Sequence, residues 1–394
     1  MRILQIIPSI SLVYGGPSQM VSGLSTALAA QNIDVTILTT DSNGDIGQPP
    51  LDVPLDKPVT QNGYQIRYFR CSPFRRYKFS LQLLQWLNQH ANEFDLAHIH
   101  ALFSPVTTIA ATVARTNNLP YILRPLGTLD PADLRKKKQL KKIYVSLLEK
   151  RNIAHAAALH FTSTQEAKIS ERFGLSTKDL VIPLGVNPPK NIPEESLVNF
   201  LQSQGIETKY PIILFMSRIE PKKGLDLLLP ALEKLLTEGI NFQFILAGAN
   251  PQDPNYEEKI RSKIQNSPLA KFTKITGFVT GEIKASLLQV SDLFVLPSYY
   301  ENFGIAVAEA MVAGTPVLIS DQVHICQDVA NAKAGWVGAC QIEDMVTLIK
   351  SALQDETERK QRGLNAKKLA ENSYSWQAIA TQTIQAYEKI IADK

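Results

Sequence analysis

The chain has 394 residues, of which 44% are hydrophobic and 20% are charged. Its length exceeds that of one typical domain and its composition is that of a globular protein, so the sequence predicts two domains and excludes a disordered or fibrous chain. The net charge of +4 is small, and no window approaches the roughly 20 apolar residues of a membrane-spanning helix, which leaves only peripheral membrane contact. The three cysteines form no C-x-x-C pair, which indicates neither a zinc site nor a disulfide framework and fits a reducing cytoplasm.

The first half of the chain alternates short β-branched runs with longer segments of helical periodicity. Such an alternation is typical of a parallel, doubly wound sheet whose strands are joined by helices. The opening MRILQIIPSI is interpreted as the first strand, because Gln5 interrupts an apolar run that is too short for a signal peptide. The sequence predicts strands at residues 2–8, 34–40, 64–70, 95–100, 121–126, 158–162 and 180–184, and helices at 17–30, 80–91, 105–115, 131–150 and 165–173.

A proline-rich segment at residues 183–193 ends this alternation, which restarts at YPIILFMSR. Segments of this composition separate domains, so we expect an N-terminal domain at 1–187 and a C-terminal domain at 188–372. Strands such as IILFM and FQFILA are apolar on both faces, as strands covered by helices on both sides must be. Residues 373–394 then form an amphipathic helix that contains Trp376 and Tyr387. The predicted fold class is therefore α/β with two doubly wound parallel sheets.

The most informative segment is PSYYENFGIAVAEAMVAGTPVLIS at residues 297–320. A polar loop carries Glu301, and Gly304 opens a short helix. The N-terminus of a helix offers unpaired N–H groups and a positive partial charge, so the segment predicts a diphosphate site. Glu309, one turn into this helix, is suited to accept hydrogen bonds from a ribose diol, while Glu301 is expected to face the sugar. The backbone expected to bind the donor belongs to Asn302, Phe303, Gly304 and Ile305.

A second segment, MSRIEPKKG, follows the first strand of the second domain. It places Arg218 at the carboxyl end of this strand and Lys223 before the next helix, in the crevice where α/β sheets bind ligands. Two fixed cations at this place can neutralise the charge that develops on a departing nucleoside diphosphate. We therefore predict that both side chains bind the donor and take part in catalysis.

Together these segments resemble the donor site of the retaining GT-B glycosyltransferases of the group 1 or GT4 type. The E-x7-E spacing of Glu301 and Glu309 carries the resemblance, and R-x-x-x-K-K-G is similar to the family's phosphate loop, with Ser217 where Gly is usual. The resemblance implies two Rossmann-like domains that face each other across a deep cleft. It also implies a nucleotide-sugar donor and transfer with retention by front-face attack, in which the donor's own phosphate accepts the acceptor proton.

Further motifs are similar to the same family. Gly15 and Gly16, in the loop after the first strand, are expected to approach the donor, and His100 matches a histidine that the family has at the end of this strand. We assign His98 to the opposite face of this strand. In ITGFV, Val279 is expected to contact the nucleotide base through its backbone. The family's terminal helix crosses back to brace the first domain, which implies the same for residues 373–394.

The segment RPLGTLDP resembles a subset of bacterial polysaccharide enzymes, which implies that Arg124, Gly127 and Asp130 line the acceptor side. The resemblance favours UDP-glucose as the hexosyl donor, because uridine is the base used by most of the family. It also favours a glycan or lipid-linked acceptor in cell-surface polysaccharide synthesis. No residue is assigned the role of nucleophile. The expected catalytic residues are Arg218, Lys223, His100 and Glu301.

No D-x-D pair appears, so we expect no metal ion and no cofactor, and a cytoplasmic enzyme. A basic cluster predicts weak, salt-sensitive contact with the inner membrane face, with a solvated helix face as the alternative. A nucleic-acid partner is not expected, because the basic clusters lack interleaved aromatic residues. A silent nucleotide-sugar-binding protein and a non-transferring enzyme of the same fold, such as an epimerase, stay as alternatives. The basic cluster consists of Arg135, Lys136, Lys137, Lys138, Lys141 and Lys142.

Overall fold

The computed structural model describes residues 1–44, 48–72, 78–135, 138–206 and 209–393. The chain divides into two compact units. Unit 1 comprises Met1–Gly185 and Trp376–Lys394, and unit 2 comprises Val186–Ser375. The chain thus leaves unit 1 after Gly185 and returns to it at Trp376. The predicted domain border at residue 187 lies two residues from Gly185, and the one at residue 372 lies three residues from Ser375.

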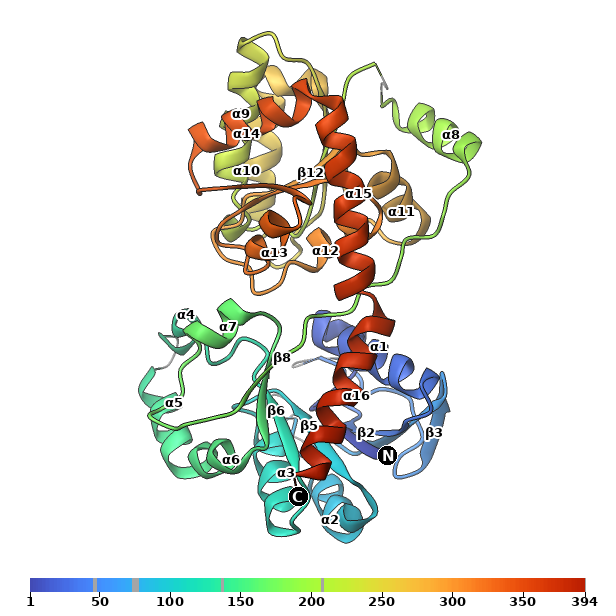
Figure 1. Cartoon of the computed structure of the whole chain (residues 1–394), viewed down its shortest axis with the longest axis vertical. Coiled ribbons are helices and arrows are strands. Elements are labelled where there is room, and N and C mark those ends of the chain that lie inside the picture. The colour runs from blue at the N-terminus through green and yellow to red at the C-terminus, as the bar shows by residue number, and fades with distance from the viewer. Residues whose placement is uncertain (45–47, 73–77, 136–137, 207–208, 394) are drawn as a thin grey trace. The chain divides into compact units, whose positions relative to one another are not determined.

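Unit 1 is built on an eight-stranded sheet in the order β3-β4-β2-β1-β5-β6-β7-β8 (Figure 1). All neighbouring strands are parallel except β3 and β4, which pair antiparallel. The chain runs outward from β1 on one side and restarts beside β1 at β5, so the topological switch point lies between β1 and β5. The strands are β1 (Arg2–Ile6), β2 (Asp34–Thr40), β3 (Pro58–Gln61), β4 (Tyr64–Phe69), β5 (Leu96–His100), β6 (Tyr121–Arg124), β7 (Ala158–Phe161) and β8 (Asp179–Val181).

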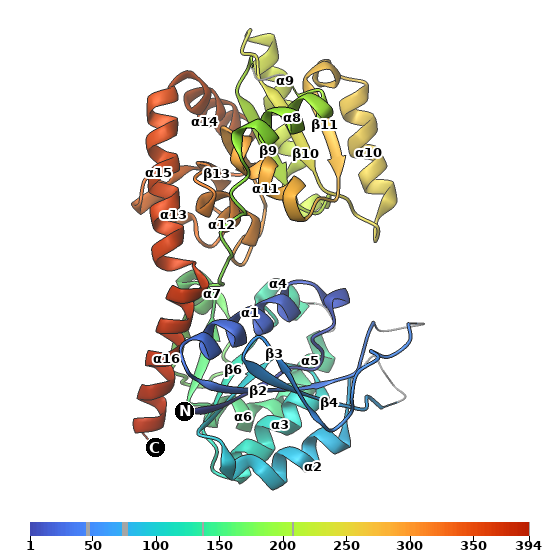
Figure 2. The same ribbon diagram turned by 90° about the vertical axis from the view of Figure 1, so that its right-hand side faces the viewer.

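Helices cover both faces of this sheet, which explains why its strands are apolar on both sides. In β1, Ile3 packs into the core on the side of α1 and α16, while Leu4 packs on the side of α2 and α3. Figure 2 shows α1 and α3 on opposite sides of the sheet. The helices of unit 1 are α1 (Gly16–Ala30), α2 (Leu81–His90), α3 (Pro105–Thr116), α4 (Pro131–Arg135), α5 (Lys138–Tyr144), α6 (Lys150–His155), α7 (Thr164–Ile169) and α16 (Trp376–Ala392).

The described residues confirm the predicted helix at residues 131–150, but its turns are not uniform. α4 covers Pro131–Arg135, and α5 continues from Lys138 into a π-helical stretch, η4 (Val145–Glu149), and then into α6. At the end of η4 the buried Glu149 carboxylate accepts a hydrogen bond from the Thr108 hydroxyl at 2.5 Å. Of the predicted basic cluster, Lys136 and Lys137 lie outside the described residues, and so does the side chain of Lys138.

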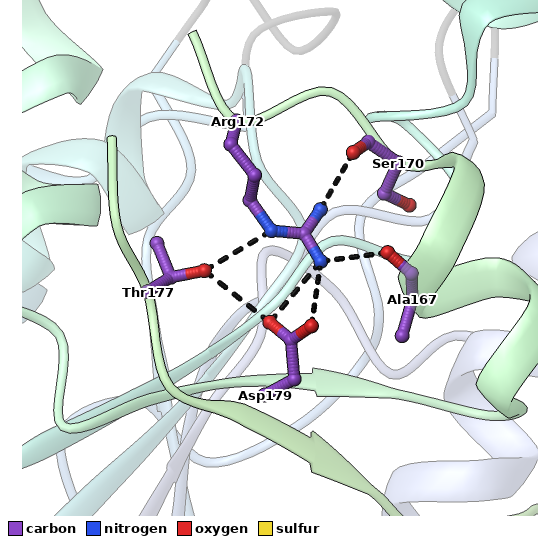
Figure 3. A network of polar contacts seen from close by, with 5 residues as sticks. All are labelled: Ala167, Ser170, Arg172, Thr177 and Asp179. Atoms are coloured by element: carbon purple, nitrogen blue, oxygen red, sulfur yellow. Dashed lines mark hydrogen bonds and ion pairs between the residues drawn. The ribbon is translucent and has the colours of Figure 1, made fainter. Parts of the chain in front are cut away.

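Arg172 holds the short edge strand β8 in place (Figure 3). Its guanidinium donates to the Asp179 carboxylate at 3.0 Å and to the Ala167 carbonyl at 2.8 Å. It also lies over the ring of Phe161, 4.5 Å from the ring centroid. One side chain therefore joins α7, β7 and β8, which fixes the last strand before the chain leaves unit 1.

Unit 2 contains a wholly parallel six-stranded sheet in the order β11-β10-β9-β12-β13-β14. Its strand order reverses between β9 and β12. Two parallel α/β sheets are therefore confirmed. No helix in the described part of the chain is long and apolar enough to cross a membrane. The strands are β9 (Ile212–Met216), β10 (Gln243–Ala247), β11 (Thr273–Gly277), β12 (Leu293–Leu296), β13 (Val317–Ser320) and β14 (Gly335–Gly338), and the helices are α8 (Glu194–Gln204), α9 (Leu225–Thr237), α10 (Pro254–Gln265), α11 (Gly281–Val290), α12 (Ile305–Val312), α13 (Cys326–Asn331), α14 (Ile342–Gln354) and α15 (Glu356–Ser373).

Candidate functional site

The loop after β9 forms a tight turn at the carboxyl edge of the unit 2 sheet. Arg218 lies just beyond the strand, a 3-10 turn covers Pro221–Lys223, and Gly224 is the N-cap residue directly before α9. Gly224 has a φ of +75°, and a Cβ at this position would lie 2.0 Å from the carbonyl oxygen of Pro297. Only glycine therefore allows the loop to pack this closely against the end of β12.

Two predicted site residues meet at this edge, because the Lys223 ammonium forms an ion pair with the Glu301 carboxylate. Their side chains are 10% and 21% exposed. Next to Glu301, the Asn302 side chain accepts a hydrogen bond from the Tyr300 hydroxyl. Arg218 is exposed, and within the described ranges no ion pair holds it. Lys223 thus shares its charge with Glu301, whereas Arg218 offers its full charge to a ligand.

The N-terminus of α12 lies on the same edge. Gly304 caps this helix with a φ of +82°, and its carbonyl accepts the first hydrogen bonds of the helix. The N–H groups of Ile305 and Ala306 precede those bonds and have no partner within the helix. The Phe303 ring is buried and packs edge-on against Tyr374, with centroids 5.2 Å apart. Phe303 can therefore contribute only its backbone to a ligand site.

A cavity of about 520 Å³ opens in unit 2 beside these segments. Three of the predicted donor-binding residues line it, namely Arg218, Val279 and Glu309. The Lys223–Glu301 pair does not line it. The remaining wall comes largely from the ends of β9 and β10 and from the start of α12. The cavity thus lies at the carboxyl ends of parallel strands, where open α/β sheets bind ligands.

Two further residues of this pocket escape prediction from the sequence. Lys284 on α11 donates from Nζ to Oε1 of Glu309 at 2.5 Å, so this carboxylate keeps one oxygen for a ligand. The Phe278 ring is 79% exposed and lines the pocket. Phe278 has a weak sequence signal, because it directly precedes Val279 and an exposed aromatic ring offers a stacking face to a base. Lys284 has none, because only the folded chain brings α11 and α12 together.

The histidines of unit 1 form a buried cluster beneath α16. The Nδ1 atom of His98 lies 2.8 Å from the Tyr387 hydroxyl, and its Nε2 lies 3.1 Å from Nδ1 of His160. The Nε2 atom of His100 lies 2.6 Å from the side-chain oxygen of Gln5. The assignment of His98 to the opposite face is wrong, since residues two apart in a strand point to the same side. Indeed, the His98 and His100 rings stack with centroids 4.4 Å apart.

This cluster keeps its imidazoles neutral. Burial lowers the pKa of His98, His100 and His160 well below the usual range, and the nearby charge of Arg124 lowers these pKa values further. Arg124 is 2% exposed, and its Nη1 lies 2.7 Å from Sδ of Met20. Its Nε and Nη2 have no hydrogen-bond partner in the part of the chain that the structure describes. Both predicted roles, that of His100 in catalysis and that of Arg124 at the acceptor side, need an accessible side chain. The buried geometry therefore does not support them.

The remaining predicted residues of unit 1 lie in two turns. Gly15 has a φ of +69° and caps α1, which begins at Gly16. Gly127 has a φ of +77°, and its carbonyl accepts a hydrogen bond from the N–H of Asp130 at 3.1 Å. The Asp130 side chain is buried, so its carboxylate is not accessible for the role predicted at the acceptor side. The contact of Gly15 and Gly16 with a donor stays a prediction.

A second cavity, of about 290 Å³, lies in unit 1 at the carboxyl ends of β1 and β5, which is the switch point of this sheet. Tyr14 and Phe103 form aromatic walls, and the Lys78 ammonium lies 4.5 Å from the Tyr14 ring centroid. Four non-glycine residues of its wall have positive φ angles, which are +80° at Ala101, +60° at Phe103, +56° at Leu126 and +46° at Lys78. Backbone held in this sparsely populated region clusters at ligand sites. The cavity is therefore the candidate second substrate site.

Each unit matches a known family model. Residues 15–185, in unit 1, match the model described as a glycosyl transferase 4-like domain. Residues 199–369, in unit 2, match the model described as glycosyl transferases group 1. The second match contains every lining residue of the unit 2 pocket, whereas the first begins after four residues of the unit 1 cavity wall, Ile7, Pro8, Ser9 and Tyr14.

Individual proteins support the same relationship. An uncharacterized glycosyltransferase of Methanocaldococcus jannaschii is 32% identical over 217 residues, which cover 53% of this chain and 53% of that protein. The alignment thus spans about half of that relative's length. Sucrose-phosphate synthase from Thermosynechococcus elongatus has a similar structure, with a TM-score of 0.75 at 21% identity over 100% of both chains. An Anabaena protein solved with UDP and glucose gives a TM-score of 0.73 at 18% identity over 98% and 99% of the two chains. These likenesses establish the fold known as GT-B.

Proposed function

We propose a donor and an acceptor for this chain, which belongs to the glycosyl transferases of group 1 and is a glycosyltransferase. The chain transfers a hexosyl group from UDP-glucose. The acceptor is a glycan or a lipid-linked glycan of cell-surface polysaccharide synthesis. One observation carries this proposal: the unit 2 pocket joins an exposed aromatic ring, a carboxylate and an exposed guanidinium. The related Anabaena fold was solved with UDP and glucose, which supports the choice of donor.

The pocket is suited to the nucleoside half of the donor. The exposed ring of Phe278 offers a stacking face to the base. The free oxygen of Glu309 accepts hydrogen bonds from the ribose diol, while Lys284 holds the other oxygen and keeps the carboxylate oriented. Lys284 is therefore a positioning residue in this account.

The edge of the pocket is suited to the diphosphate. Arg218 and the N–H groups at the start of α12 offer positive charge where the leaving phosphate gains negative charge. Lys223 lies in the same loop and holds Glu301 next to the helix start. We propose that Lys223 stabilises the leaving group and that Glu301 orients Lys223 and the sugar without acting as a nucleophile.

We further propose that transfer is metal-independent and retains configuration. The acceptor oxygen attacks the anomeric carbon from the side on which the bond to the phosphate oxygen breaks, and the acceptor proton passes to that phosphate oxygen. Arg218, Lys223 and the α12 N-terminus supply the positive charge that this step needs. The small unit 1 cavity is the proposed acceptor site, and the enzyme is placed in the cytoplasm with peripheral contact at the inner membrane face.

Incubation of the full chain with UDP-glucose and extracts of polysaccharide and lipid-linked glycan tests the proposal, with release of UDP and the product anomer followed by NMR. We expect UDP release that depends on one extract, an α-linked product from the α-linked donor, and activity that persists in EDTA. A β-linked product overturns retention, and loss of activity that Mg²⁺ restores overturns metal independence. Absence of UDP release with every extract overturns the proposed reaction.

A further inference from the structure

The helical segment at residues 138–155 exposes apolar side chains on its outer face. Single exposed apolar residues are ordinary on a protein surface, but several within two turns of one helix mark an interaction site. Leu140 and Ile143 on α5 follow the i, i+3 spacing of one helix stripe, and Leu147 follows them on η4. Their exposed fractions are 63%, 58% and 74%, and Leu148 beside them is 49% exposed.

Basic side chains flank this stripe. Exposed cations lie before, within and after it at Arg135, Lys142 and Lys150. The acidic residues of the segment do not oppose them, because Asp133 is paired with Lys141 at 2.7 Å and Glu149 is buried. The outer face therefore combines apolar side chains with net positive charge, which is the pattern of a helix that lies in the interface of an anionic membrane.

The inner side of this segment is fixed to the rest of unit 1, so its exposed face is not that of a detached helix. Glu149 accepts hydrogen bonds from the Thr108 hydroxyl at 2.5 Å and from the N–H of Phe103 at 3.3 Å. The Tyr144 hydroxyl lies 2.8 Å from the Thr108 hydroxyl. Phe103 lines the unit 1 cavity and also carries the Lys141 ammonium 5.3 Å from its ring centroid. The helix is thus joined directly to the wall of the candidate acceptor site.

We propose that the outer face of α5 and η4 seats in the interface of an anionic phospholipid bilayer, with Leu140, Ile143 and Leu147 inserted among the acyl chains. The unit 1 cavity then receives the polar head of an acceptor that is anchored in the same bilayer. This inference rests on the proposed function, because it selects the lipid-linked acceptor over the free glycan. It goes beyond electrostatic contact, because apolar insertion survives salt in part whereas purely ionic attachment does not.

Vesicle flotation of the full chain tests the seating. The probes are vesicles of phosphatidylcholine alone and of phosphatidylcholine mixed with phosphatidylglycerol. We expect the wild type to float with the mixed vesicles, and the triple variant Leu140→Gln/Ile143→Gln/Leu147→Gln to lose at least about tenfold in its partition coefficient, because each inserted side chain contributes apolar burial. Leu364→Gln is the matched control, since Leu364 on α15 of unit 2 is 65% exposed and lies outside the segment.

Two further readouts, thermal shift and size-exclusion chromatography, keep the inference separate from the proposed function. The triple variant is expected to retain the wild-type thermal shift with UDP-glucose, which shows that it folds and binds the donor. Equal flotation of the wild type and the triple variant overturns the inference. So does a dimer in size-exclusion chromatography that the triple variant abolishes, because a second copy then covers this face. Normal flotation without any response to UDP-glucose instead overturns the proposed function and leaves the membrane face standing.

Discussion

The carboxyl edges of the two sheets use charge in opposite ways. In unit 2, Lys223 with Glu301 and Lys284 with Glu309 place ion pairs at or beside an open pocket, with Arg218 exposed at its edge. In unit 1, the polar residues of the strand ends are buried beneath α16, and the cavity has aromatic and aliphatic walls. The pocket of unit 2 therefore has ion pairs and an exposed guanidinium at its edge, whereas the cavity of unit 1 has largely apolar walls with the Lys78 ammonium among them.

The buried histidine cluster of unit 1 is tested most sharply by the dependence of stability on pH. The folded chain lowers the pKa of His98, His100 and His160 below their unfolded values, so below about pH 6.5 the unfolded chain binds more protons and stability falls. The slope for each neutral histidine approaches about 1.4 kcal/mol per pH unit well below pH 6.5, so the three together lower the stability by about 4 kcal/mol in total between pH 7.5 and 5.5. Denaturant unfolding between pH 7.5 and 5.5 measures this slope.

A pair of variants assigns this slope to the cluster. His160→Gln should remove about one third of it, because one of three titrating groups is lost. His155→Gln is the control, since His155 on α6 is exposed and lies outside the cluster. Arg124 and Tyr387 also face the cluster and keep their charge between pH 7.5 and 5.5, because the pKa of Arg124 is lowered only to about 10 and burial raises the pKa of Tyr387 above its usual range. Gln5, which carries no charge, and Glu166 lie near the same groups. Stability that does not vary over this range contradicts neutral buried imidazoles.

Arg218→Ala tests the charged carboxyl edge of the unit 2 sheet through its effect on turnover. By analogy with the loss of one transition-state hydrogen-bond donor, kcat should fall roughly 100- to 1000-fold, while Tm stays near that of the wild type because the side chain is exposed. Lys222→Ala in the same loop is the matched control, since Lys222 contacts Glu220 at 3.6 Å and does not line the pocket. Lys223→Ala should lower both kcat and Tm, because it leaves Glu301 unpaired. Equal kcat values for the Arg218 and Lys222 variants contradict the assignment.

Phe278→Ala tests whether the exposed aromatic ring in the wall of the unit 2 pocket stacks on the base. Loss of base stacking of about 1–3 kcal/mol should raise the Kd for UDP-glucose by roughly 5- to 150-fold, with little change in kcat. Phe278→Tyr should preserve the affinity. Ile283→Ala is the control, because Ile283 is 49% exposed on the neighbouring helix but does not line the pocket. Fluorescence or calorimetric titration with UDP-glucose measures the difference, and an unchanged Kd in Phe278→Ala removes the stacking role.

Lys284→Met is expected to have the smallest effect. The Lys284–Glu309 pair is 31% and 21% exposed, and a partly exposed ion pair contributes about 0.2–1 kcal/mol. Its loss should therefore raise the Kd for UDP-glucose by roughly fivefold at most and leave kcat unchanged. Lys274→Met, on β11 and outside the pocket, should have no effect. A large fall in kcat with an unchanged Kd would show that Lys284 touches the reacting groups and does not merely position Glu309.

Local chemistry explains what the sequence predicts well. Gly224 and Gly304 have positive φ angles directly before α9 and α12. Because this backbone requirement selects glycine, the sequence reveals where both helices start and which N–H groups are unpaired. The spacing of Glu301 and Glu309 around the second glycine then predicts one residue in the loop and one on the helix, as the structure has them.

Contacts between distant segments explain what the sequence does not predict. His100 and Arg124 end parallel strands, which is where ligands bind, but both are buried. His100 stacks on His98, which contacts Tyr387 of α16 from the far end of the chain, and Arg124 contacts Met20 of α1. Lys284 and Glu309 are recognisable as a pair only once α11 and α12 are folded against the same pocket. The wall of the unit 1 cavity includes strained backbone at Ala101, and an alanine gives no sequence signal for a positive φ angle.

The most direct test of the central claim is calorimetric titration of UDP-glucose into the wild type and Glu309→Ala. The account predicts one site per chain in the wild type. It predicts a Kd roughly 10- to 150-fold higher in the variant, because hydrogen bonds to a charged acceptor contribute about 1.5–3 kcal/mol. Wild-type protein that binds none of UDP-, GDP- or ADP-glucose, or a Glu309→Ala variant that binds UDP-glucose as tightly as the wild type, contradicts the assignment of this pocket to the donor.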